Sequence, residues 1–135
     1  MNTASIVSYL AAQLPGVKVG GAAEADSAMA ASSPVTPACY VIEEANQVAE
    51  TGIGDDLTID VAIAIYIVTR NAKDSYGTAS VAFSAPLRDQ IINALHGYIP
   101  PESIGPLVYQ GGQLADFSPG LVWWSERFTT VRQII

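Results

Sequence analysis

The chain has 135 residues, of which 50% are hydrophobic and 14% are charged, a composition that fits one globular domain and excludes general disorder. A formal net charge of −7 disfavours binding to phosphates or to an anionic membrane through overall charge. The longest apolar run, residues 61–68, falls well short of the roughly 18 residues that a membrane-spanning helix needs. The lone cysteine, Cys39, and the absence of basic residues before Lys18 predict cytoplasmic residence rather than secretion.

The first part of the chain predicts a helix, a short strand and a loop. Apolar residues recur at helical spacing over residues 6–14 and stop at Pro15-Gly16, which predicts a short amphipathic helix that covers a sheet. A brief strand is expected at 17–19. Residues 20–37 are rich in Gly, Ala and Ser and contain two prolines, so we expect a mobile loop, or an arm that orders on a partner.

The middle of the chain predicts a long β-hairpin. Residues 38–42 form a strand that continues in more polar form to about residue 50, and the turn is expected at 52–54. Hydrophobic residues alternate over 57–68, the clearest strand pattern in the chain. Residues 62–68 are apolar on both faces, so the base of the hairpin should be buried and its tip solvated.

The negative charge is concentrated in the first half of the chain. Residues 19–69 contain eight acids and neither Lys nor Arg, so one face or edge of the fold should be strongly negative. Four of these acids surround the expected hairpin turn: Glu50, Asp55, Asp56 and Asp60.

The second half predicts one helix and three strands. The helix covers 78–95 and ends at Gly97, and Pro86 either kinks it or stands in the first turn of a new helix. Short strands are expected at 107–109 and 113–117, around a turn at Gly111-Gly112, and a long aromatic strand at 121–134. These elements predict a single α+β domain over residues 1–135, in which two helices pack on an antiparallel or mixed sheet with a long hairpin.

The residue types that most often act in catalysis or ligand binding stand here in positions typical of structural roles. No catalytic, metal-binding or cofactor-binding site is therefore predicted. His96 stands at the expected C-terminus of the second helix, where it meets the helix dipole favourably. Cys39 lies in an apolar strand without a basic neighbour in sequence, as an inert thiol does. The hairpin acids lack the ligand spacing of a calcium loop, and neither Gly20-Gly21 nor Gly111-Gly112 has the sequence of a phosphate loop.

Two tryptophans, Trp123 and Trp124, are neighbours in the last expected strand. Adjacent strand residues face opposite sides of a sheet. We therefore expect one ring to pack in the core of the subunit and the other to lie at an assembly interface.

Six segments in chain order carry a resemblance to a known family. They are Pro37-Ala-Cys-Tyr-Val41, the strand 58–70, Asp74-Ser-Tyr-Gly77, Ala94-Leu-His-Gly-Tyr98 with Pro100 after it, Pro106-Leu-Val-Tyr-Gln-Gly-Gly112 and Leu121-Val-Trp-Trp-Ser-Glu-Arg-Phe128. Together they resemble the tail terminator proteins of long-tailed bacteriophages. The resemblance implies a small α+β subunit of a hexameric ring on the head-proximal end of the tail tube. Such a ring stops tube polymerisation and offers a docking surface to neck or head-completion proteins.

The residues and the resemblance together predict a structural virion protein without a cofactor, assembled in the host cytoplasm. Its expected partners are further copies of itself, the tail tube protein and a neck or head-completion protein. DNA is expected to pass through the ring without specific binding, and the four hairpin acids either face that channel or lie on the outer rim. The alternatives are a neck adaptor, a tube subunit, or a small cytosolic enzyme or ligand-binding domain. Stoichiometric incorporation into purified virions would distinguish a virion protein from the enzyme or ligand-binding domain.

Overall fold

The strand that alternates most clearly in sequence lies at the centre of the sheet. The computed structural model describes four stretches of the chain: residues 2–51, 57–71, 78–118 and 120–134. Its strands are β1 (Lys18–Gly20), β2 (Ala38–Thr51), β3 (Leu57–Arg70), β4 (Val108–Ser118) and β5 (Leu121–Ile134). They form one sheet in the order β1-β2-β3-β5-β4, in which only the β1–β2 pair is parallel. The α+β class, the mixed sheet and the long β2–β3 hairpin are confirmed.

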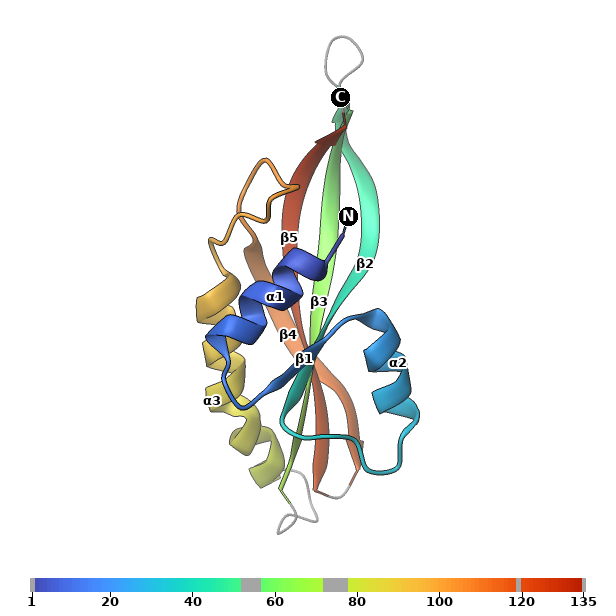
Figure 1. Cartoon of the computed structure of the whole chain (residues 1–135), viewed down its shortest axis with the longest axis vertical. Coiled ribbons are helices and arrows are strands. Elements are labelled where there is room, and N and C mark those ends of the chain that lie inside the picture. Colours follow the sequence, from blue (N-terminus) through green and yellow to red (C-terminus); the bar gives the residue numbers. More distant parts are fainter. Residues whose placement is uncertain (1, 52–56, 72–77, 119, 135) are drawn as a thin grey trace.

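Helices α1 (Ala4–Gln13) and α3 (Thr78–Leu95) cover one face of this sheet (Figure 1). Alternation in β3 directs Ile63, Ile65 and Ile67 toward these helices, because every second side chain of a strand points to the same face. The fully buried residues that meet them are Ile6 and Leu10 from α1, Ile91 and Leu95 from α3, Leu107, and Phe128 from β5. This layer is the main hydrophobic core.

A third helix, α2 (Ala22–Ala30), packs on the opposite face, at the end of the sheet away from the hairpin tip (Figure 1). The loop expected over 20–37 is therefore wrong for residues 22–30. Alanine is the strongest helix former, and the small side chains of Ala25 and Ala28 let the helix lie close to Tyr40 and Trp123. The composition of this segment did not predict the helix, because its apolar surface consists of alanine methyl groups and the residues it packs against belong to β2 and β5. The mobility of residues 20–37 stays a prediction.

Two further expectations are corrected. Gly111 and Gly112 lie inside β4 and do not form a turn, so one strand replaces the two short ones expected there. Helix α3 continues through Pro86, so no new helix starts at this proline. The described chain thus contains three helices where the sequence predicted two.

The hairpin has the expected gradient of burial. Val41 and the β3 residues 63–65 and 67–69 are buried, whereas residues 44–48 of β2 and Asp60 of β3 are exposed. The expected turn at 52–54 lies outside the described residues. Among the helices that the described residues form, none is long and apolar enough to cross a membrane.

Candidate assembly surface

Beyond α2, the second face of the sheet carries no helix among the described residues. We call this surface the open face, and its residues are Gln47, Asp60, Ala62, Tyr66, Gln110, Arg127 and Thr129, together with Glu44. They come from β2, β3, β5 and β4, and the strand registers place them side by side. A shallow groove of about 480 Å³ crosses the part nearer the hairpin tip, between Gln47, Asp60, Gln110 and Thr129. Its lining combines amides, hydroxyls, methyl groups and the single carboxylate of Asp60, which suits contact with another macromolecule.

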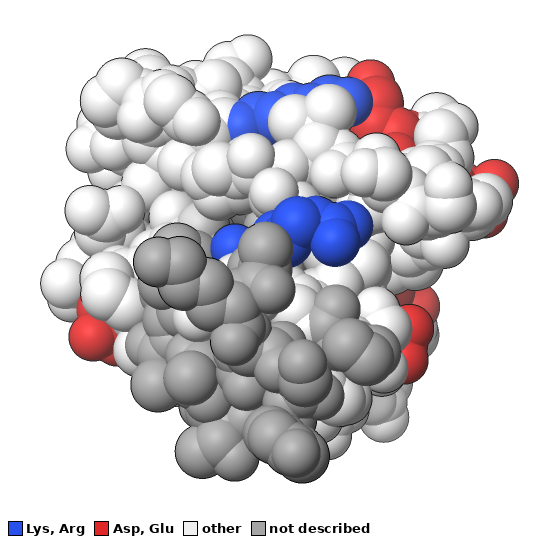
Figure 2. Space-filling model, turned by 90° about the horizontal axis from the view of Figure 1, so that it is seen from below, with Lys and Arg blue, Asp and Glu red and all other residues white. Residues whose placement is uncertain are grey.

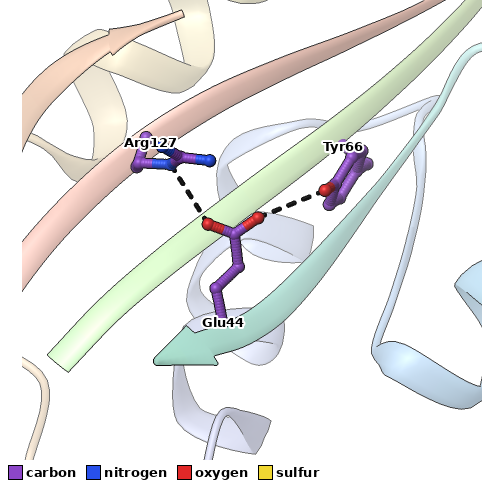
Figure 3. A network of polar contacts seen from close by, with 3 residues as sticks. All are labelled: Glu44, Tyr66 and Arg127. Atoms are coloured by element: carbon purple, nitrogen blue, oxygen red, sulfur yellow. Dashed lines mark hydrogen bonds and ion pairs between the residues drawn. The ribbon is translucent and has the colours of Figure 1, made fainter. Parts of the chain in front are cut away.

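Glu44 organises the centre of the open face (Figure 3). Its carboxylate accepts a hydrogen bond from Tyr66 Oη at 3.2 Å and forms an ion pair with Arg127 Nε at 3.1 Å. Burial and the adjacent Glu44 carboxylate raise the pKa of Tyr66, so this phenol stays a proton donor. These two contacts connect β2, β3 and β5, and they pair the positive charge of Arg127 with the Glu44 carboxylate. Sequence reasoning missed it, because a register shift between Glu43 and Ala45 interrupts the alternation there.

A second polar cluster lies on the helix-covered face, around the buried carboxylate of Glu126. Tyr109 Oη and Trp124 Nε1 both donate hydrogen bonds to it, the latter at 2.8 Å, and the Arg88 guanidinium stacks 4.0 Å from the Trp124 ring centre. Burial, followed by the hydrogen bond to Glu126, raises the pKa of Tyr109 to about 12. Gly112 provides the space for this carboxylate, since an added Cβ would overlap Glu126 Oε2.

The Glu126 cluster explains two of the segments that resemble tail terminators. Residues 106–112 supply Tyr109 and Gly112, and residues 121–128 supply Trp124 and Glu126. The two segments pair in antiparallel register as β4 and β5. Their pattern of glycine, aromatic and acidic residues therefore encodes one buried polar contact between neighbouring strands.

Trp123 and Trp124 do point to opposite faces of β5, as expected. Trp123 is 5% exposed and packs with Tyr40, its ring centre 6.1 Å away, under α2. Trp124 is half-buried and packs against the main core beside Arg88. Both rings thus have partners within the subunit, and an interface role for one of them stays a prediction.

The hairpin acids are described only in part. Asp60 is exposed on the open face, where it lies opposite Gln47 of β2 and Val131 of β5. Glu50 belongs to β2, but its side chain is not described, and Asp55 and Asp56 lie outside the described residues. Figure 2 shows the opposite end of the molecule. Basic and acidic side chains both lie on the described part of this surface.

The residues considered for chemistry take structural positions. Cys39 is fully buried, and burial raises the pKa of its thiol to about 12, which makes the thiolate unavailable near neutral pH. His96 follows the last residue of α3, and its Nδ1 accepts the backbone N–H of Tyr109 at 3.2 Å. Among the described residues, no group of three or more His, Cys, Asp or Glu side chains could hold a metal ion.

Two edges of the sheet are left unpaired by the described strands. On one side β4 is the outermost strand. On the other side β1 covers only residues 38–40 of β2, so the rest of β2 is also an edge. Edge strands present free N–H and C=O groups that pair readily with another chain. The candidate site is therefore an assembly surface made of the open face and these two edges.

Comparison with known proteins decides the family. Residues 1–135, the whole chain, match the family model described as phage tail terminator protein. The chain belongs to the phage tail terminator family. Among solved structures, a chain from the virion of a native gene transfer agent particle has a similar fold, with a TM-score of 0.57 and 17% sequence identity. The similarity covers 98% of this chain and 94% of that chain. A comparison with curated proteins gave no significant match.

Family membership confirms the resemblance and makes the chain a structural protein of phage tails. The uncovered sheet face and the free strand edges are the surfaces that the described fold leaves for contact with other tail or head proteins. The buried Glu126 cluster supports the subunit itself, because its members lie between the sheet and α3.

Proposed function

We propose that this tail terminator forms a hexameric ring that caps the head-proximal end of the tail tube. The ring stops tube polymerisation and offers its other surface to a neck or head-completion protein. The observation that carries the proposal is the family match over the whole chain. The free edges and the open face supply surfaces through which such a ring can assemble.

The strand directions support closure into a ring. The four long strands β2, β3, β5 and β4 alternate in direction across the sheet. Copies related by a rotation axis along the strands would therefore place β4 antiparallel to the β1–β2 edge of the next copy. A contact between two different edges is heterologous, and such contacts generate rings when the rotation closes.

The distribution of helices supports an orientation for the subunit. Helices α1 and α3 cover one face completely enough to form an outer layer, which leaves the open face for the channel. DNA must not adhere there, and each free Lys or Arg contact to phosphate would add salt-dependent affinity. On the open face, Arg127 forms an ion pair with Glu44, so its charge is already partly neutralised within the chain. Glu50, Asp55, Asp56 and Asp60 are the acids that we assign to the channel.

Immunogold electron microscopy of purified tails tests the position of the protein. We expect antibody label at the head-proximal end only, in an amount that corresponds to one ring. Label along the whole tube would identify a tube subunit, and label on the connector of tail-less heads would identify a neck adaptor. Purified tails without any label would contradict a structural role in the virion.

A further inference from the structure

Two opposite charges stand at the two edges of the sheet in the same row. Lys18 of β1 lies opposite Ala38 of β2, which lies opposite Val68 of β3. Val68 lies opposite Trp123 of β5, which lies opposite Asp116 of β4. One line of directly paired residues therefore begins at Lys18 and ends at Asp116, across all five strands.

Lys18 and Asp116 also share a face of the sheet. Directly paired residues point to the same side, and Ala38, Val68 and Trp123 all pack in the cluster beneath α2. The two charged side chains thus project on the α2 side, at opposite edges. A neighbouring copy that continues the sheet by rotation would bring the Asp116 edge of one subunit to the Lys18 edge of the next.

Both side chains are exposed within the subunit. Among the described residues, Lys18 forms no ion pair within 4.0 Å, and the nearby Glu24 carboxylate accepts the backbone N–H of Gly21 at 3.1 Å. Asp116 Oδ1 accepts the N–H of Phe117 at 2.8 Å, which leaves its other oxygen for a partner. Each charge is therefore available to a second chain.

Exposed apolar side chains accompany the charges on both edges. Leu114 and Phe117 lie beside Asp116 in β4 and are 47% and 37% exposed. Val35, which lines a cleft together with Lys18, is 57% exposed. A second copy of the chain matches this surface in charge, in apolar character and in strand direction.

We propose that Lys18 of one subunit pairs with Asp116 of the next subunit and sets the register between their sheets. The inference rests on the ring proposed above and names the contact that joins its subunits. An exposed ion pair adds little affinity, but it discriminates against shifted arrangements that would place like charges or apolar groups opposite each other. Its role is to align neighbouring subunits in one row without a stagger.

Disulfide trapping tests the register directly. The double variant Lys18→Cys with Asp116→Cys should give a ladder of covalent oligomers on a non-reducing gel, in tails assembled by phage that carry it. Directly opposed antiparallel residues have a Cα separation that a disulfide can bridge. The native Cys39 is buried and does not interfere. The matched control is Lys18→Cys with Asp89→Cys, because Asp89 is an exposed acid on α3, and it should give no ladder.

Exchanging the two charges is the second test of the Lys18–Asp116 contact. Lys18→Glu and Asp116→Lys should each lower the fraction of tails that carry a ring several-fold, and the double variant should restore it. Rings seen by electron microscopy without a ladder and without this rescue would overturn the Lys18–Asp116 contact and leave the ring intact. Wild-type tails that contain no ring of this protein would overturn both proposals.

Discussion

A buried carboxylate explains why the chain has a glycine in the middle of a strand. Glu126 is 1% exposed and is retained because Tyr109 and Trp124 donate hydrogen bonds to it. These donors fix the carboxylate directly over Gly112, where no Cβ fits. At the residue scale, stability in β4 and β5 thus depends on a polar group rather than on further apolar packing.

Gly112→Ala should lower the free energy of unfolding by about 1–3 kcal/mol, because the new methyl group overlaps a carboxylate that two hydrogen bonds hold in place. Urea unfolding followed by circular dichroism measures the change. The control is Gly105→Ala, since a Cβ at Gly105 has open space within 4 Å, and its effect should be small. Equal stability of the two variants would contradict the packing role of Gly112.

Alkaline pH should weaken the subunit through Tyr109. The pKa of this phenol is about 12 in the folded chain against an ordinary value of 10. Between these two values the unfolded chain loses the proton that the folded chain keeps, so the free energy of unfolding falls as pH rises above about 10. Urea unfolding between about pH 8 and pH 11 should show a steeper fall for the wild type than for Tyr109→Phe. Tyr98→Phe, which removes a phenol outside the Glu126 cluster, is the control for the loss of a tyrosine.

At the scale of the elements, the sequence predicted structure wherever side-chain periodicity was strong. The alternation in β3 and the aromatic run of β5 have the expected bounds to within a few residues, because both strands bury one face under helices. Helix α2 was missed, since the residues that hold it, Tyr40 and Trp123, are distant in sequence. Gly112 suggested a turn because its true reason, the Glu126 carboxylate, lies on the neighbouring strand.

The candidate site was less predictable than the fold. The Glu44–Arg127 ion pair joins residues 44 and 127, and only the completed sheet brings them together. The row from Lys18 to Asp116 likewise depends on four strand pairings that no local pattern contains. The sequence did predict that Trp123 and Trp124 face opposite sides, because this follows from strand geometry alone.

The two tryptophans should differ in what they support. Trp123→Ala should cost about 3–5 kcal/mol of stability, because the ring is buried between α2 and the sheet. Trp124→Ala removes a half-buried ring and the hydrogen bond from its Nε1 to the buried Glu126 carboxylate, so it should also lower stability. It should in addition weaken ring incorporation into tails at matched folded concentration. Chemical unfolding and quantitative blotting of tails measure the two effects. Equal destabilisation with unchanged incorporation would remove the assembly role of Trp124.

At the scale of the whole molecule, the uneven cover of the sheet favours one surface for the channel of the proposed ring. Two helices shield one face, while the open face combines an internally paired Arg127 with the exposed Asp60. In the proposed ring the net charge of −7 per chain would add up over the copies, so a channel lined by this face would repel the duplex.

Asp60→Lys should therefore slow DNA ejection in a salt-sensitive way without unfolding the subunit, since an exposed acid contributes little to stability. Ejection kinetics of virions at two salt concentrations measure the effect. Asp89→Lys makes the same change of charge on α3, which covers the other face of the sheet, and should leave ejection unchanged. If both variants eject at the wild-type rate, the acids lie away from the channel.

Tail length is the most direct measure of whether this chain terminates the tube. Tails assembled without the chain and tails assembled with it should be compared by electron microscopy, with tube length measured for each particle. We expect a single narrow length when the chain is present, and overlong tubes without attached heads when it is absent. Tubes of the same narrow length in both samples would contradict the assignment as a terminator.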